Sequence, residues 1–436
     1  MTDTFLPDEG KRPVLVAGVR TPFLKSGTGF QGLSAADLGV SVMQEVLARS
    51  EVGPDEVDEV ILGCCGQSSK EANVARVLSL RAGLPTETPA YTVHRNCASG
   101  MQSIEEGARR IQEKPDGIYL VGGTESMSDY PLLFNDGFKS FLGALARCKS
   151  TSARLRQLMR FRLRYLKPRI ALLEGLTDPT CGLVMGLTAE KLAEEFAISR
   201  KDQDLFAVAS HQKAVDAWAS GQMDDEVLTM WPGKARKAVR MDNGPREGQN
   251  LDALSRLRPF FDRREGSVTV GNACPVTDGS VALMLMSEAT AQARGLQPLG
   301  RMICSTTVGL EPDRMGLGPA IAAPRAIRDA GLDARDMEVW EINEAFSAQV
   351  LACLDAMDSA SFGRDRLGLT GAFGAPDIDK VNPRGGAVAL GHPVGATGSR
   401  LVLSLLRQLQ ANGGGMGIAT LCVGGGQGAA QIWEAA

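Results

Sequence analysis

Short apolar runs alternate with amphipathic segments along the chain. Residues 14–19 form a β-rich run, and apolar positions spaced for one helical face predict a helix over residues 34–49. Ser34 can cap the first turn of this helix. A second strand is predicted at residues 60–62. Strands that alternate with helices in this way favour an α/β fold with a mostly parallel sheet, covered on both faces.

The second half of the chain repeats this order. A helix predicted near residues 319–330 precedes an apolar run at 339–342, just as the helix at 34–49 precedes the run at 60–62. Between helix and run, one glycine and two aspartates recur at identical spacing: Gly53, Asp55 and Asp58, then Gly331, Asp333 and Asp336. Chance similarity of common α/β patterns is the alternative, and the matched spacing argues against it.

Two further segments correspond in the same way. The strand-like runs at residues 91–93 and 388–390 each lead into a glycine-rich turn and an amphipathic helix. Each helix is followed by another apolar run, at 118–121 and 417–421. We therefore interpret the chain as two copies of one βαβ-rich unit.

Residues 131–264 belong to neither copy, so we expect an inserted, mostly helical loop domain, with helices near 187–196 and 202–218. An apolar run at 281–286 then returns the chain to the first sheet and could complete it. The predicted domains are an N-terminal half of residues 1–130 plus 265–290, the insertion 131–264, and a C-terminal half of residues 291–436.

The composition is that of a globular protein with two or three domains. The 436 residues are 44% hydrophobic and 22% charged, and the net charge of −4 argues against a nucleic-acid binder. No apolar run approaches the roughly 20 residues of a membrane span. The first residues lack the patterns of a signal or transit peptide, so we expect a cytoplasmic protein.

One cysteine lies where a reactive thiol is favoured. The nine cysteines include no CxxC pair and no histidine at zinc-ligand spacing, so neither a disulfide framework nor a structural metal site is expected. Cys97 lies where a β-run meets a helix, and the unpaired N–H groups and helix dipole there lower a thiol's pKa. Such a thiolate would attack acyl carbonyls. A buried core cysteine is the alternative.

The chain has three histidines, and His392 is the best candidate base for Cys97. It lies in the turn that corresponds, in the second copy, to the turn with Cys97, so packing of the copies would bring the two together. His94 is the competing base, but its three-residue offset on an extended segment points it away from Cys97. His211 is interpreted as a solvent-facing helical residue without a catalytic role.

Two later segments add polar groups. Cys422 ends the last predicted strand of the second copy and precedes three glycines, whose N–H groups can approach an oxygen that gains charge. Asn343 follows the run at 339–342 and could polarise a carbonyl directly or through a water.

The four segments NCASG, NEAF, GHPVGATG and CVGGGQG, in this order, resemble the thiolases, and the resemblance covers nearly the whole chain. It implies two βαβ-rich halves in five α-β-α-β-α layers, an inserted loop domain and a homodimer. It also implies thiolytic cleavage of 3-ketoacyl-CoA by CoA in fatty-acid β-oxidation, with no metal or other cofactor. An acetoacetyl-CoA thiolase that runs a Claisen condensation is the alternative.

The resemblance implies a role for each candidate residue. Cys97 would accept the acyl group, His392 would activate it, and Cys422 would exchange a proton with the substrate's α-carbon. Asn343, through a bound water, would share one oxyanion hole with His392, and the N–H groups of Cys97 and Gly424 would form the second. A ketosynthase or a lipid-binding scaffold on this fold fits less well, because neither would keep this set of residues.

Within the family, the segments AMDSASF and EANVAR and the long insertion look most like the β subunits of fatty-acid oxidation trifunctional complexes. That likeness implies an enoyl-CoA hydratase/3-hydroxyacyl-CoA dehydrogenase partner subunit. Those subunits usually carry a histidine at the position of Asn343, so this chain departs from their pattern. Cys274, where many thiolases have a small polar residue, is a second departure.

Residues 137–173 are strongly basic. They contain no acidic residue and ten positive charges, which leaves a net charge of −14 on the rest of the chain: Lys139, Arg147, Lys149, Arg154, Arg156, Arg160, Arg162, Arg164, Lys167 and Arg169. Leucines and Met159 between them are spaced for one helical face, as in a helix that lies on an anionic membrane or grips an acidic partner. A solvated basic face with an apolar stripe toward the core, and a site for the phosphates of CoA, are the alternatives.

Overall fold

The computed structural model describes residues 3–233 and 237–435. Residues 1–2, 234–236 and 436, which belong to the N-terminal half, the insertion and the C-terminal half expected from the sequence, lie outside the described residues. The dominant element is an 11-stranded sheet. Two short strands lie off its main path: β1 (Asp3–Phe5) pairs with β10, and β3 (Leu24–Lys25) pairs with β9. Along the main path, neighbouring strands follow in the order β11 (Met337–Ile342), β12 (Gly415–Val423), β13 (Gln427–Ala435), β10 (Gly300–Gly309), β2 (Pro13–Arg20), β9 (Thr277–Ser287), β6 (Ile118–Glu125), β4 (Glu59–Gly63) and β5 (Ala90–Val93).

The sheet consists of two parts with a narrow join. β10 contacts β2 only through the pairs Gly300–Leu15 and Arg301–Val14, whereas β9 pairs with β2 and β6 along most of its length. The run at 281–286 lies in β9, so the prediction that it completes the sheet of the first half is confirmed.

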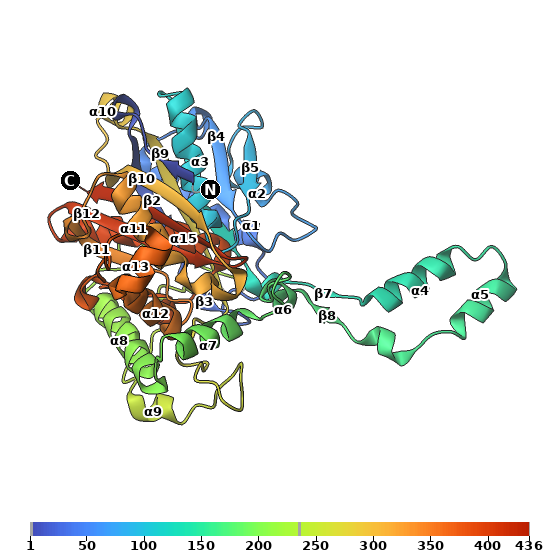
Figure 1. Ribbon diagram of the computed structural model, residues 1–436. Helices are drawn as coiled ribbons and strands as arrows, with labels where there is room; N and C mark the ends of the chain where they lie inside the picture. Colours follow the sequence, from blue (N-terminus) through green and yellow to red (C-terminus); the bar gives the residue numbers. More distant parts are fainter. Residues whose placement is uncertain (1–2, 234–236, 436) are drawn as a thin grey trace.

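Five layers follow from the helices that cover the two parts (Figure 1). Helices α3 (Ser99–Glu113) and α15 (Val394–Ala411) pack against each other between them. Helices α1 (Ala35–Ser50) and α2 (Val74–Ala82) cover the outer face of the N-terminal part. On the outer face of the C-terminal part lie α11 (Gly318–Asp329) and α12 (Ser347–Asp358). The central layer is the most buried part of the core and contains the ends of the helices that carry the candidate site.

The predicted elements largely form, but the mostly parallel sheet is wrong. β4 runs parallel to β5 and β6, and β11 to β12, while the remaining neighbours on the main path are antiparallel. Connectivity explains one of these pairs, because β12 and β13 are joined by a tight turn, which only antiparallel strands permit.

The predicted strand at 388–390 is also wrong, because these residues form the short helix α14 (Ala387–Leu390). The backbone N–H of Val388 donates to the carboxylate of Glu344 (3.1 Å), and that of Leu390 to the carbonyl of Gly386 (2.8 Å). These donors are therefore used within a helical turn and by a side chain, not by a neighbouring strand. Helix α13 (Ala360–Leu367) also lies in the C-terminal half, and α10 (Glu288–Ala293) spans the border between the two halves and packs on β2 and β9.

The insertion has a packed part and a projecting part. Helices α7 (Met185–Glu195), α8 (Arg200–Ala219) and α9 (Leu251–Ser255) lie against the body, where α7 contacts α12 and α8 contacts α14. Another part of the insertion, residues 132–173, projects away from the body (Figure 1). We call it the extension. It contains β7 (Leu132–Leu133), α4 (Asp136–Ala146), α5 (Thr151–Leu158), the 3-10 turn Leu163–Leu166, β8 (Arg169–Ile170) and the start of α6 (Ala171–Gly175).

The extension is not the single amphipathic helix that the spacing of its leucines predicts. The chain turns back between α4 and α5 (Figure 1), and the returning segment packs on α4, where Phe161 and Tyr165 lie against Phe141 with ring centroids 5.5 and 5.9 Å apart. The apolar stripe does not face the core either. Its five side chains are 49–81% exposed: Leu155, Leu158, Met159, Leu163 and Leu166. No helix of the described ranges is both long and apolar enough to cross a membrane.

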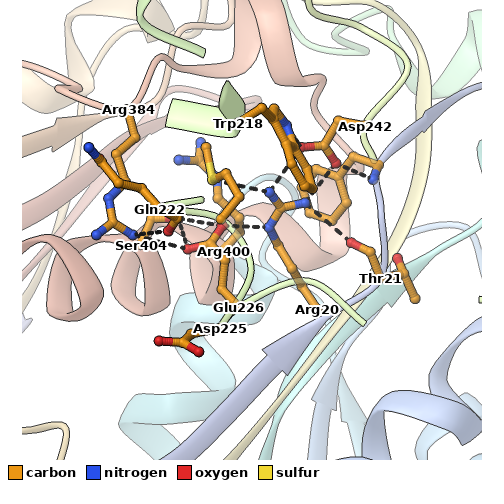
Figure 2. Close-up of polar contacts among 12 residues, drawn as sticks. Arg20, Thr21, Trp218, Gln222, Asp225, Glu226, Asp242, Arg384, Arg400 and Ser404 are labelled. Carbon is orange, nitrogen blue, oxygen red and sulfur yellow. Dashed lines mark hydrogen bonds and ion pairs between the residues drawn. The ribbon is translucent and has the colours of Figure 1, made fainter. Parts of the chain in front are cut away.

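A buried cluster of charges ties the insertion to both halves (Figure 2). Arg20, at the end of β2, donates through Nε to Glu226 (2.7 Å) and through both terminal nitrogens to Asp242 (2.7 and 2.9 Å). Trp218 donates to Asp242 (3.3 Å), and Ser404 of α15 to Glu226 (3.3 Å). Because an unpaired buried charge is costly, these contacts fix the insertion in one position on the body.

Candidate active site

Cys97 and His392 each lie two residues before a helix of the central layer, at the N-terminal ends of α3 and α15. The two helices touch near these ends, where the Ser399 hydroxyl donates to the carbonyl of Gly100 (2.9 Å). A Cβ at Gly398 would lie 2.5 Å from the backbone nitrogen of Met101, so only glycine permits this approach. The N-terminal ends of the two helices that carry Cys97 and His392 are therefore adjacent.

The Cys97 thiol is neutral in this setting. Burial raises its pKa, and the backbone N–H groups of Gly424 and of Cys97 itself, which favour the thiolate, only partly offset this. The negative charge of Glu125 raises the pKa further. The lowered pKa expected from the helix end alone is therefore wrong, and Cys97 needs a base to become a nucleophile.

The hydrogen bonds of His392 show which ring nitrogen can act as that base. Nδ1 lies 2.7 Å from the hydroxyl of Thr397, and this hydroxyl donates its one proton to the carbonyl of Pro393 (3.0 Å). On this hydrogen-bond pattern we assign the imidazole proton to Nδ1, which leaves Nε2 with a free lone pair. Nε2 is buried and has no hydrogen-bond partner among the described residues. Burial, together with the charge of Arg400, lowers the pKa of His392 to about 3, so the ring is neutral.

Asn343 and Cys422 come from two neighbouring parallel strands. Asn343 directly follows β11, and its backbone N–H donates to Thr420 of β12 (2.9 Å), two residues before Cys422. Both amide atoms of Asn343 are buried and unpaired among the described residues. Burial raises the pKa of Cys422 well above its usual value, and the neighbouring thiols add to this, so Cys422 holds its proton.

Gly424 is fixed against the residue before Cys97. The side-chain nitrogen of Asn96 donates to the carbonyl of Gly424 (2.7 Å), and Asn96 itself has the left-handed φ of 43°. Gly425 and Gly426 have φ values of 89° and 77°, which residues with a Cβ rarely adopt. This turn thus presents the N–H of Gly424 toward the sulfur of Cys97.

Two family descriptions match this chain along almost its whole length. Residues 13–289 match the N-terminal domain of thiolase and residues 296–435 match its C-terminal domain. The chain belongs to the thiolase family. Thiolases are acyltransferases, and the two helix ends described above lie one in each of the two matched thiolase domains.

Relatives of this thiolase cover nearly all of its residues. A 3-ketoacyl-CoA thiolase of Yersinia enterocolitica is 39% identical over 428 residues, which are 98% of this chain and 97% of that protein. The structure of an acetyl-CoA acetyltransferase of Bacillus anthracis has a TM-score of 0.85 at 38% identity, covering 98% of this chain and 99% of that one. The human mitochondrial 3-ketoacyl-CoA thiolase in complex with CoA has a TM-score of 0.83 at 34% identity, covering 99% and 100%. These likenesses confirm the expected thiolase fold.

The other two histidines of this thiolase differ from each other in burial. His94 is exposed. His211 on α8 is only 5% exposed, so its interpretation as solvent-facing is wrong. Burial, followed by the charges of Arg246 and Lys25, lowers the pKa of His211 to about 4.

Sequence reasoning missed several residues that hold the site in place. Glu344 accepts hydrogen bonds from Ser210 (2.6 Å), Asn382 (2.8 Å) and Val388, and so fixes α14, which precedes His392. Thr397 sets the tautomer of His392. Glu344 lies within the NEAF segment, but the hydrogen bonds of Glu344 and Thr397 form only in the folded chain. No local sequence pattern reveals them.

The described parts of the thiolase chain contain no group of three or more His, Cys, Asp or Glu side chains placed to hold a metal ion.

Proposed function

We propose that this thiolase cleaves 3-ketoacyl-CoA with CoA, giving acetyl-CoA and a shortened acyl-CoA, as in fatty-acid β-oxidation. The observation that carries the proposal is the free lone pair on Nε2 of His392, buried at a helix end that adjoins the one bearing a neutral Cys97 thiol. In the absence of substrate both Cys97 and His392 are uncharged, and the thiolate forms only when a substrate is bound.

The first half of the reaction breaks a carbon–carbon bond. The sulfur of Cys97 attacks the C3 ketone while Nε2 of His392 takes its proton. The C2–C3 bond then breaks, the acyl group stays on Cys97 as a thioester, and the departing acetyl-CoA enolate receives the proton of Cys422. The raised pKa of Cys422 fits this role, because a thiol that holds its proton can donate it to a carbon.

The second half regenerates the enzyme. The thiol of CoA attacks the acyl-Cys97 thioester, its proton passes to a base of the site, and the Cys97 thiolate leaves and is reprotonated. Two carbonyls gain negative charge during the cycle, so two oxyanion sites are needed. We propose that Asn343, through a water, and His392 stabilise one, and that the N–H groups of Cys97 and Gly424 stabilise the other.

Replacement of the proposed nucleophile tests this mechanism. Cys97→Ala lowers thiolysis by at least about 10³-fold and abolishes the acyl adduct that mass spectrometry detects on the intact protein. Cys148→Ala, a change of the same type in the extension, keeps both. Activity of Cys97→Ala near that of the wild type contradicts the proposal.

The length of the preferred acyl chain separates the degradative role from acetoacetyl-CoA synthesis. The Bacillus anthracis relative is an acetyl-CoA acetyltransferase, whereas the Yersinia enterocolitica relative is a 3-ketoacyl-CoA thiolase. We expect kcat/KM for 3-ketohexadecanoyl-CoA to exceed that for acetoacetyl-CoA when both are assayed side by side with CoA. A preference for acetoacetyl-CoA would favour the short-chain alternative.

We also propose the domain division and assembly that the sequence implies. The N-terminal half comprises residues 1–130 and 265–290, the insertion comprises 131–264, and the C-terminal half comprises 291–436. Pairing of β9 with β2 and β6 supports the assignment of 265–290 to the N-terminal half. A homodimer, and a hydratase/dehydrogenase partner subunit, complete the proposal. Light scattering on the purified chain, alone and mixed with candidate partner subunits, tests both.

The extension favours a second role, attachment of this cytoplasmic thiolase to an anionic phospholipid surface. Of its ten basic side chains, Arg169 alone forms ion pairs within the described part of the chain, with Asp136 and Glu174. Exposed apolar side chains lie among these charges, and the segment stands clear of the body (Figure 1). A cationic, apolar and projecting surface matches an anionic bilayer in both charge and polarity.

Co-sedimentation with vesicles tests this attachment. We expect binding to phosphatidylglycerol vesicles and little binding to phosphatidylcholine vesicles. The triple change Arg156→Glu, Arg160→Glu and Arg164→Glu weakens binding by about 10²-fold or more, since each basic residue contributes roughly 1 kcal/mol. Arg256, Arg258 and Arg263 are exposed on the insertion outside the extension. The matched reversal of these three charges leaves vesicle binding unchanged. Binding that survives the first reversal contradicts the proposal.

A further inference from the structure

A single buried carboxylate connects the two halves behind the candidate site. Glu125 ends β6 and is fully buried. Its Oε2 accepts from the backbone N–H groups of Cys65 (3.0 Å) and Gly395 (2.8 Å). Its Oε1 accepts from the N–H of Gly66 (2.7 Å) and the hydroxyl of Tyr130 (3.3 Å). The thiol of Cys64 also donates to Oε1 (3.9 Å), so both oxygens have at least two donors.

Two of these donors support the nucleophile from the N-terminal half. Cys65 and Gly66 follow β4 and lie beneath the turn that carries Cys97. The sulfur of Cys65 lies 3.1 Å from the carbonyl oxygen of Asn96 and 3.4 Å from the hydroxyl of Ser99, the residues on either side of Cys97 and Ala98. The position of this loop thus sets the position of the Cys97 backbone.

The third backbone donor belongs to the base. Gly395 lies in the first turn of α15, three residues after His392. A Cβ at Gly395 would lie 2.8 Å from both the Cα of Cys64 and Oε2 of Glu125, so the loop, the carboxylate and the helix are packed without free space. We propose that Glu125 is a positioning residue for the reaction, whose carboxylate holds the Cys97 turn and the His392 helix in one mutual geometry.

The proposal explains why a costly buried acid is present here. Burial raises the pKa of Glu125, and the three backbone N–H donors oppose that rise. Neutral side chains of the same size cannot accept four hydrogen bonds from this set of donors, because an amide has one accepting atom. The charge also acts on Cys97, which itself lies close enough to the thiols of Cys65, Cys274 and Cys422 to raise their pKa values.

Glu125→Gln is the principal test, because it keeps the shape and removes the charge and one accepting atom. We expect kcat for thiolysis to fall by about 10²-fold, the loss typical of catalytic groups displaced by about 1 Å, with KM changed less than about threefold. The pH midpoint for alkylation of Cys97 by iodoacetamide shifts downward, because loss of the negative charge favours the thiolate. Glu125→Asp keeps the charge but withdraws it, so kcat falls while the alkylation midpoint shifts less than in Glu125→Gln.

Two controls separate positioning from simple loss of stability. Glu105→Gln removes another buried carboxylate, on α3 and bonded to Ser305 and Arg109, and lowers the thermal midpoint without moving the alkylation midpoint. Tyr130→Phe removes a single donor to Glu125 and lowers kcat by about tenfold, the effect of one hydrogen bond to a charged group. If Glu125→Gln fails to fold, Tyr130→Phe is the deciding variant. Wild-type kcat in Glu125→Gln, or in Tyr130→Phe if only that variant folds, overturns the proposal.

Discussion

Asn343 is a residue whose burial costs stability. Neither its amide oxygen nor its amide nitrogen is hydrogen-bonded to another described residue, although the side chain is fully buried. An unsatisfied buried polar group costs about 1–3 kcal/mol. Action on a substrate would explain why a residue is kept at that cost, and this agrees with the oxyanion role proposed for Asn343.

Replacement of Asn343 is expected to lower activity without lowering stability. Asn343→Ala lowers kcat by about 10²–10³-fold, the usual loss for one oxyanion contact, and leaves the thermal midpoint unchanged or higher. Asn382 is the matched control, because its amide is fully used by Ile342 (2.8 and 2.9 Å) and Glu344 (2.8 Å). Asn382→Ala therefore lowers the thermal midpoint. If Asn343→Ala keeps kcat within threefold, the oxyanion role is wrong.

At the same scale, local sequence predicts which residue types are available but not their ionisation. The motifs place Cys97 and His392 at helix N-termini, and the structure places them there. The pKa of Cys97 could not be predicted, because it depends on burial by segments distant in the chain and on the charge of Glu125. The tautomer of His392 likewise depends on how the Thr397 hydroxyl is used within the folded turn.

Elements with strong local signals are predictable from sequence, and those fixed by distant partners are not. Helix α1 begins where Ser34 accepts from the N–H of Asp37, as the pattern predicts. The strand predicted at 388–390 fails because its N–H donors are used by Glu344 and by a helical turn, which apolar periodicity does not encode. The extension fails as one helix because its aromatic residues pack back on α4.

The contact between α3 and α15 gives a prediction at this scale. Gly398→Ala introduces a Cβ 2.5 Å from a backbone nitrogen, forces the helices apart and displaces His392. We expect a loss of about 1–3 kcal/mol in unfolding free energy and a lower kcat. Gly143→Ala in α4, where the new Cβ meets only the end of Arg147 at 3.5 Å, raises or preserves stability. Denaturant unfolding of both variants measures the difference, and equal stabilities would contradict the close packing.

For the whole molecule, two buried histidines make folding sensitive to acid. The pKa of His392 is lowered to about 3 and that of His211 to about 4, while both take up protons near pH 6.5 when the chain unfolds. The unfolded state therefore binds more protons than the folded state at pH values between 6.5 and about 4. Stability is fully present above pH 6.5 and falls as the pH drops through this range.

The slope of stability against pH shows how much the buried histidines contribute to this loss. Each histidine contributes up to about 1.4 kcal/mol per pH unit, so the thermal midpoint of the wild type falls steadily between pH 6.5 and pH 4.5. His211→Gln, which removes a titrating group outside the catalytic site, makes the fall shallower. His94→Gln replaces an exposed histidine and leaves the slope unaltered. Identical slopes in all three proteins would show that His211 is not responsible.

The late position of β9 in the chain determines when the protein can fold during its synthesis. β6 ends at Glu125, and the strand that covers its open edge begins only at Thr277. At roughly 5–20 residues per second, a ribosome needs about 8–30 s to make the intervening chain. For that time the nascent N-terminal part exposes an unpaired strand edge, so the first half cannot close until the whole insertion has left the exit tunnel. Chaperones that bind nascent chains are expected to shield this edge until β9 emerges.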